Sequence, residues 1–168
     1  LYETYVSFVD MNNQPVQATS FAYGFESSAD TNGVASLPLL ASGTVVEVLY
    51  DGQGVSKELF GNQQGQTVQI IALPEGHWTL PSSSTIVLGA RPDGQPHQLN
   101  GDLTFSSNSH LKLIDTTLVV AQTSEVDLGP SGTLTGDNGV LNASLLTMSV
   151  QSVSYTHLTL PTTCAVYM

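Results

Sequence analysis

Two stretches, LNGDLTFSSNSHLKL at residues 99–113 and GPSGTLTGDNGVL at residues 129–141, decide the fold of the second half of the chain. A 23-residue shift places apolar residues on apolar residues: Leu103 on Val126, Phe105 on Leu128, Leu111 on Leu134, and Leu118 on Leu141. The same shift backwards places Leu103 on Leu80 and Leu111 on Leu88. Repeats of about 20–29 residues with short strands are typical of β-solenoids, whose coils must stack to bury a shared interior.

The sequence therefore predicts the first rungs of a parallel β-solenoid over residues 76–152, with about two and a half rungs. Each rung is expected to supply three short strands: LTF, LKL and LVV, then VDL, TLT and VLN. A leucine-rich repeat would need an L-x-x-L-x-L pattern with asparagine, which is not found here. The alternative is a second β-sandwich, in which GARPDG and GPSG form hairpin turns.

On these two stretches, the second half resembles the beginning of right-handed parallel β-helix proteins of the pectin-lyase-like kind. The resemblance covers about 70 residues and rests on patterning rather than on a signature motif. It implies stacked coils whose outer face, in many such proteins, carries carboxylates that cut or modify polysaccharides.

The first half shows short alternating runs separated by Gly, Asn and Pro turns, which predicts an antiparallel β-sandwich over residues 1–75. The expected strands are the runs TYVSFVD, VQATSFAYGF, VASLPL, TVVEVLY, VSKELF and TVQIIAL. Apolar residues on both faces of TVVEVLY, except at Glu47, predict a central strand. The whole chain is thus predicted to be all-β, a small Ig-like sandwich followed by a solenoid.

This first half resembles the carboxypeptidase regulatory-like or Cna-B-like domains, which have a prealbumin-type sandwich. The matching positions lie in two turns and a closing strand: Asp10, Pro15 and Val16, then Asp30, Asn32 and Gly33, then Val68, Ile70 and Leu73. Such domains are mostly spacers and adhesion modules. Some carry a Lys–Asn isopeptide bond, but Lys57 lies too late in the run for that role.

The last stretch, residues 153–168, resembles translated sequencing adapter, the mosaic end used in transposase-based libraries. The match covers about ten consecutive residues, from Val153 to Thr162. We therefore expect this tail to be non-native, so that His157 and Cys164 carry no functional information. The natural protein is then expected to continue differently beyond Gln151, and the chain to be a fragment open at both ends.

Composition excludes several classes of function. Fourteen acidic residues against three basic ones give a formal net charge of −11, which excludes binding to nucleic acid or to an anionic membrane surface. No apolar run approaches the ~18 residues of a membrane helix, so no membrane insertion is expected. Low charge content and a single cysteine, Cys164, fit an extracellular or cell-surface all-β protein without disulfides.

Three acidic residues are the candidates for an active or cation-binding site. The 23-residue shift places Asp102 on Glu125, and Asp127 follows two positions later on the same outer side. Stacked strands lie ~4.8 Å apart, and like charges that close raise one pKa or recruit a cation. Acid–base chemistry or Ca²⁺-assisted sugar binding would follow, while the alternative is an ordinary solvated face.

The remaining chemistry-bearing residues receive structural interpretations. Asp30 and Asn32 have part of the spacing of a Ca²⁺ loop, but later acidic ligands are missing, so a turn is expected. Trp78 is expected to cover the first rung, with sugar stacking as the alternative. His97 and His110 lack metal-ligand spacing and are expected on the surface. Residues 142–144 form a glycosylation sequon, a short pattern that also arises by chance.

We therefore expect a fragment of a secreted or cell-surface structural or adhesive protein, non-catalytic in this part, with polysaccharide or cell-surface glycans as partners. No catalytic, cofactor-binding or metal-binding residue is assigned, and Ca²⁺ is the one ion considered. The first alternative is the N-terminal part of a β-helix polysaccharide lyase or hydrolase. The second is a phage fibre protein.

Overall fold

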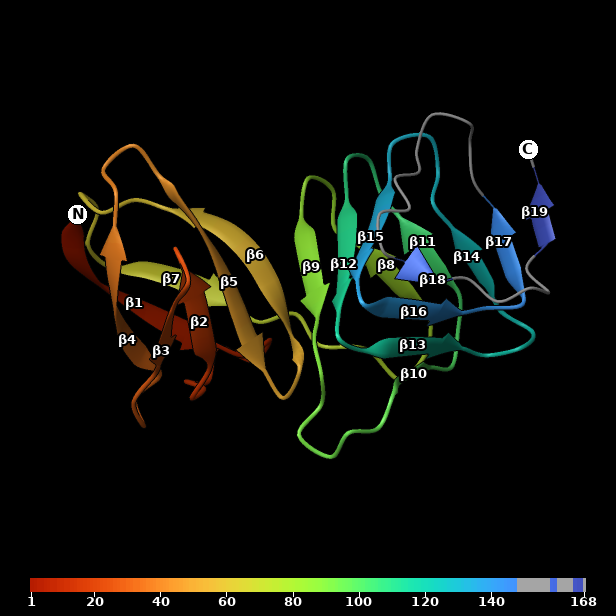
Figure 1. The fold of residues 1–168 in the computed structure, drawn as a ribbon, viewed down its shortest axis with the longest axis horizontal. Helices are drawn as coiled ribbons and strands as arrows, with labels where there is room; N and C mark the ends of the chain where they lie inside the picture. Colours follow the sequence, from red (N-terminus) through yellow and green to blue (C-terminus); the bar gives the residue numbers. More distant parts are fainter. Residues whose placement is uncertain (148–157, 160–164, 168) are drawn as a thin grey trace. The chain divides into compact units, whose positions relative to one another are not determined.

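A computed structural model describes residues 1–147, 158–159 and 165–167. All regular secondary structure in these ranges is β-strand (Figure 1). The chain divides into two compact units, Leu1–Ala72 and Leu73–Met168, described separately below. The all-β prediction is confirmed. No helix among the described residues is long and apolar enough to cross a membrane.

The first unit contains a three-stranded sheet with β1 (Tyr2–Val9) at its centre. β4 (Val34–Leu39) runs antiparallel to β1 on one side, and β7 (Gln66–Gln69) runs parallel to it on the other. The parallel pair departs from the purely antiparallel sandwich that the sequence predicted. Alternate side chains of this sheet are fully buried: Val6, Phe8, Leu37, Leu39 and Val68.

A second, antiparallel sheet completes this unit, in the order β6 (Gln53–Leu59), β5 (Thr44–Tyr50), β2 (Thr19–Ala22) and β3 (Phe25–Ser28). β5 lies between two neighbours, as predicted. Only one of its faces is buried, however. Val46 and Val48 are inaccessible, whereas Val45 is 63% exposed. Each sheet thus contributes one apolar face to the core.

The run VQATSFAYGF, expected as one strand, is a hairpin instead. Tyr23 and Gly24, between β2 and β3, have φ values of 51° and 77°. Two consecutive positive φ angles form a tight turn whose twist matches that of an antiparallel strand pair. The glycine after the aromatic run was the sequence feature that marked this turn.

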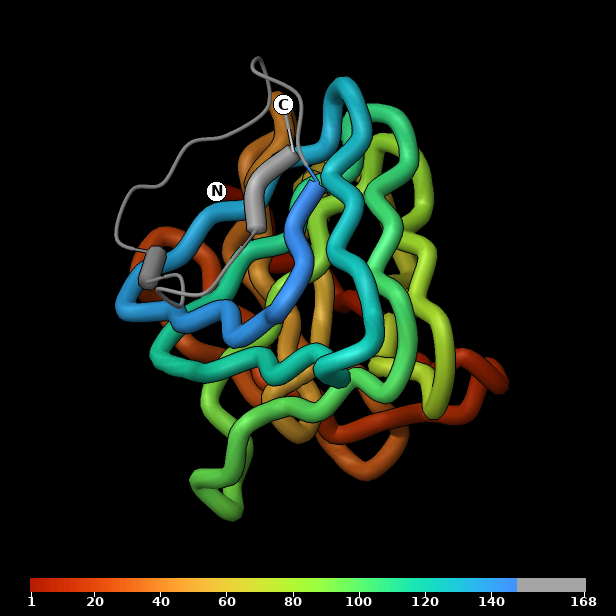
Figure 2. The backbone as a smooth tube through the Cα atoms, turned by 90° about the vertical axis from the view of Figure 1, so that its right-hand side faces the viewer, coloured from red at the N-terminus to blue at the C-terminus, as the bar shows by residue number. Residues whose placement is uncertain are grey.

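The second unit is a parallel stack of short strands, a β-solenoid region of about three turns over residues 78–147 (Figures 1 and 2). Every strand pair among the described residues of this unit is parallel, which excludes the second sandwich with hairpin turns. The first turn comprises β8 (Trp78–Leu80), β9 (Thr85–Leu88) and β10 (His97–Leu99). The second comprises β11 (Leu103–Phe105), β12 (His110–Ile114) and β13 (Thr117–Val120).

The third turn comprises β14 (Glu125–Asp127), β15 (Thr133–Asp137) and β16 (Gly139–Asn142), and β17 (Leu145–Thr147) follows it. Between the second and third turns the predicted 23-residue register is confirmed: Leu103 pairs with Val126, Leu111 with Leu134, and Leu118 with Leu141. All six of these side chains have no accessible surface. They form the continuous apolar interior that the repeat predicted.

The backward extension of the 23-residue register is wrong. Leu103 pairs with Trp78 and Leu111 with Ile86, so the predicted partners Leu80 and Leu88 are each displaced by two positions. The loop between β9 and β10 is longer than its counterpart between β12 and β13, and the following connection is shorter. As a result, fewer residues separate the paired positions of the first and second turns at β10, where His97 pairs with Leu118, than at β8 and β9.

The described segments of the tail are β18 (Leu158–Thr159) and β19 (Ala165–Tyr167), which pair in parallel with β16 and β17. The predictions for His157 and Cys164 fall outside the described residues, and the non-native origin of residues 153–168 stays a prediction.

Candidate functional site

The candidate site is a column of polar side chains on the outer face of the sheet formed by β8, β11, β14 and β17. Because Leu103 pairs with both Trp78 and Val126, the residues before them occupy equivalent positions in successive turns. These residues are His77, Asp102 and Glu125. The predicted stacking of Asp102 and Glu125 is confirmed, and His77 adds a third member.

Asp102 is hydrogen-bonded to both of its neighbours in this column. Its backbone N–H donates to His77 Nδ1 at 2.9 Å, and its Oδ1 accepts the backbone N–H of Glu125 at 2.8 Å. Since His77 Nδ1 accepts a hydrogen bond, that nitrogen is unprotonated in this arrangement. The 3.4 Å approach of Asp102 Oδ2 to Nδ1 is thus not an ion pair unless the bond rearranges.

The other two carboxylates of the candidate set are held by different partners. The Thr147 hydroxyl, from β17, donates to Glu125 Oε1. Asp127 Oδ1 accepts the backbone N–H of Gly129 at 2.9 Å, which closes a turn at the end of β14. In the described ranges, no group of three His, Cys, Asp or Glu side chains could hold a metal ion. The geometry therefore ties each carboxylate to the fold.

His97 is not on the surface, so that prediction is wrong. Its side chain is buried in β10, where it stands in register with the inward-facing Leu118. Its Nε2 donates to the Gly89 carbonyl at 2.8 Å, and burial lowers its pKa below the usual value near 6.5. The 23-residue shift places His97 on Val120, which is also buried, so the repeat itself carried a signal for this inward position.

His110, also expected on the surface, is half-buried in β12. Its Nε2 lies 2.6 Å from the hydroxyl of Thr135, in the next turn. Burial lowers the pKa of His110, and the positive charge of Lys112 lowers it further. The neutral forms of His97 and His110 are consequently favoured over that of a free histidine.

We expect the free energy of unfolding of the second unit to fall as the pH drops from 7.0 to 5.5. Histidines with a lowered folded-state pKa bind protons more readily when unfolded, so their stabilising effect is complete above about pH 6.5 and decreases below it. The slope is at most about 1.4 kcal/mol per pH unit for each histidine.

Urea unfolding followed by the fluorescence of Trp78 measures this slope, because Trp78 is the single tryptophan and is buried in β8. The variant His97→Gln, which retains a donor, should show a shallower dependence. A free energy of unfolding that is constant or rises as the pH falls over this interval would refute the assignment.

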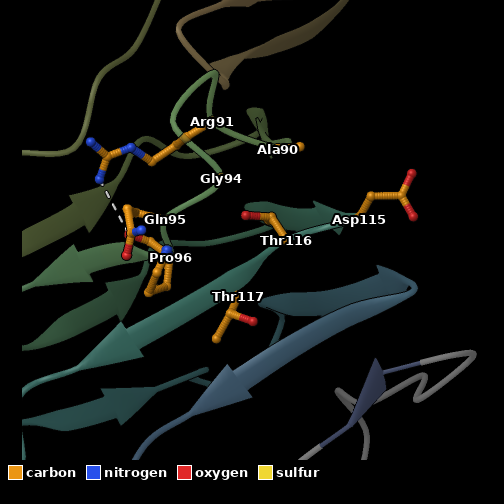
Figure 3. A pocket seen from close by; sticks show the side chains of 8 residues that line it. All are labelled: Ala90, Arg91, Gly94, Gln95, Pro96, Asp115, Thr116 and Thr117. Atoms are coloured by element: carbon orange, nitrogen blue, oxygen red, sulfur yellow. Dashed lines mark hydrogen bonds between the residues drawn. The ribbon is translucent and has the colours of Figure 1, made fainter.

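A small hollow lies beside the long β9–β10 loop (Figure 3). Its volume is about 280 Å³, and its lining includes Arg91, Gln95, Pro96, Asp115, Thr116 and Thr117. Figure 3 shows Arg91 and Asp115 on opposite sides of it. The Arg91 guanidinium donates to Asp93 at 2.9 Å and to the Pro96 carbonyl at 3.2 Å, and Asp115 accepts from Asn138 at 3.0 Å. The GARPDG stretch indicated only a turn, and nothing in the sequence pointed to this hollow.

In the first unit, Asp30 caps a turn, as expected. Its Oδ1 accepts the backbone N–H groups of Asn32 and Val34, both at 2.9 Å, and Gly33 has a φ of 73°. The hydrogen bond from Val34, followed by that from Asn32, lowers the pKa of this exposed carboxyl. The carboxylate is thus used by the turn itself.

No protein-family model and no curated protein matches the chain. The structure defines the class of protein by its architecture: an all-β chain that contains a parallel β-solenoid region of about three turns. The carboxypeptidase regulatory-like, Cna-B-like and pectin-lyase-like resemblances stay predictions.

Proposed function

We propose that the chain is part of a structural or adhesive protein that acts outside the cell or on its surface. In this proposal the solenoid is a rigid stalk, and the first unit is a spacer or binding module. The observation that carries it is the use of polar side chains to join successive turns. Three such links each span 23 residues: Asp102 to the amide of Glu125, Ser131 to the amide of Asn108, and Asn138 to Asp115.

These links favour a stalk over a catalytic surface because they occupy the groups that catalysis would need. A solenoid is stabilised by the sum of its turns and of the contacts between neighbouring turns. A hydrogen bond from one turn to the next adds directly to that second contribution. A glycan-cleaving site needs carboxylates directed toward substrate, whereas Asp102 and Asp127 accept backbone amides at 2.8 and 2.9 Å.

The extracellular location is supported by composition. Charged residues make up 10% of the chain, and much of its polarity comes from uncharged side chains. This composition is more typical of extracellular all-β proteins than of cytosolic ones. Glycans are retained as expected partners because the outer face offers hydroxyl groups at Thr79 and Thr104 in adjacent strands.

The variant Asp102→Ala tests the stalk. We expect it to lower the free energy of unfolding of the second unit by about 1 kcal/mol, because the Glu125 amide loses its acceptor. Proteinase K digestion under native conditions should then be about fivefold faster within residues 99–128, as local opening becomes more frequent. Mass spectrometry of the fragments locates the cuts.

Asp51→Asn, in the β5–β6 turn, is the matched control, since it also removes one carboxylate and Asn tolerates the positive φ of 51° at that position. Wild-type protein that is cut as readily between Trp78 and Thr147 as an unfolded chain would refute the stalk. Release of oligosaccharides from a pectin or alginate solution, abolished by Asp102→Ala, would favour the lyase or hydrolase alternative.

A further inference from the structure

The exposed large apolar side chains of the described chain are concentrated in the first unit. All ten that are more than a third exposed lie between Leu1 and Tyr50. Two of them, Phe21 and Val45, lie on the outer face of the antiparallel sheet, since their neighbours Ser20, Ala22, Thr44 and Val46 are buried. A solvent-facing sheet surface normally carries polar side chains, so these residues require an explanation.

Acidic residues surround this apolar pair. Phe21 stands in register with Glu26 on one side and Glu47 on the other, and Val45 stands opposite Glu58. Cross-strand partners point to the same face and approach within about 5 Å. We define these five residues, Phe21, Glu26, Val45, Glu47 and Glu58, as the acidic face.

The four strands that form this surface contain one basic residue, Lys57. Lys57 pairs with the buried Val46, and its Nζ donates to the carbonyl of Thr67 in the other sheet at 3.2 Å. It therefore points away from the acidic face. Across the whole first unit, residues 1–72, seven acidic residues accompany this single lysine, for a formal charge of −6. The electrostatic potential of the acidic face is consequently negative.

We propose that the acidic face binds an arginine-rich segment of another protein, in which arginines alternate with apolar residues. Carboxylates hold guanidinium groups by paired hydrogen bonds, and an aromatic ring such as Phe21 attracts a cation over its face. Arginine suits both contacts better than lysine does, because its planar group stacks and hydrogen-bonds at once. The apolar side chains of the segment would cover Val45.

The negative charge of the acidic face argues against the other binding partners that such a surface could have. A second copy of the chain carries the same negative charge and is repelled, as are nucleic acids and anionic membranes. A neutral glycan would not neutralise three carboxylates around an apolar pair. This inference rests on the binding role proposed for the first unit and is independent of the stalk role proposed for the second.

A direct test titrates the full chain with a fluorescein-labelled peptide of alternating arginine and leucine, eight residues long, and follows anisotropy. We expect saturable binding that weakens with added salt. The lysine–leucine peptide should bind more weakly, and the glutamate–leucine peptide should not bind. Phe21→Ser and Glu26→Gln should each weaken binding of the arginine peptide by about fivefold.

Asp51→Asn is the matched control, because it removes the same charge outside the acidic face and should change the affinity by less than about twofold. Val45→Thr, at a 63%-exposed position, keeps a β-branched side chain and is a second test if Phe21→Ser unfolds. Absence of binding to wild type, or equal weakening by Asp51→Asn and Glu26→Gln, would overturn the proposal. Protease sensitivity of the solenoid tests the stalk separately, so either idea can fail alone.

Discussion

The variant Leu111→Ala is expected to lower the free energy of unfolding of the second unit by about 3 kcal/mol. Leu111 has no accessible surface and stands in register between Ile86 of the first turn and Leu134 of the third. Its removal leaves a cavity lined by both neighbouring turns, so the transfer free energy and the packing of two interfaces are lost together. Urea unfolding monitored by Trp78 fluorescence measures the loss.

Gln98→Ala is a suitable control, since Gln98 is an exposed residue of β10 in the same stack. It should change the free energy of unfolding by less than about 0.5 kcal/mol. A loss below about 1 kcal/mol for Leu111→Ala would mean that the side chain does not fill a shared interior. The stacking of the three turns would then be wrong.

Gly54→Ala is expected to destabilise the first unit by about 3 kcal/mol or more. A Cβ atom built on Gly54 would lie 1.7 Å from the carbonyl oxygen of Val48 in the neighbouring strand β5. The obstacle is backbone rather than a flexible side chain, so the β5–β6 pair has to separate to accept the methyl group. Thermal unfolding followed by circular dichroism measures the effect.

Gly76→Ala is the matched control, because nothing lies within 4 Å of a Cβ atom there and Gly76 is absent from the positive-φ positions. Gly76→Ala should leave the thermal stability of the protein nearly unchanged. A Gly54→Ala protein as stable as Gly76→Ala would show that β5 and β6 are not paired in the register Leu49 with Gly54.

The solenoid was predictable from the sequence where successive turns have equal length. Leucine and valine recur with the same spacing at all three strands of the second and third turns, and the pairs that this spacing defines are buried. The first turn was predicted wrongly because its loop after β9 is longer. Leu80 and Leu88 are apolar and match the 23-residue shift, while the true partners of Leu103 and Leu111, Trp78 and Ile86, are equally apolar. Hydrophobicity alone therefore could not distinguish the two registers.

The candidate site was predictable to the same extent. The stacking of Asp102 on Glu125 followed from the repeat. The hydrogen bond from the Glu125 backbone amide to the Asp102 carboxylate did not, because the direction of such a bond depends on the side-chain rotamer. His77 was missed since it lies 25 residues before Asp102, outside the repeat length that the sequence indicated. The acidic face was missed for another reason: its members come from four strands, and pairing register is not local information.

The unequal turn lengths have a practical consequence. The long β9–β10 loop lies between Trp78 and Leu103 in the sequence, yet these two residues pair in register and both are buried. The solenoid thus accommodates a longer loop within one turn, and the inward-facing residues on either side of it keep their register. A foreign epitope grafted between Arg91 and Gln95 would be displayed on a protein that folds as before.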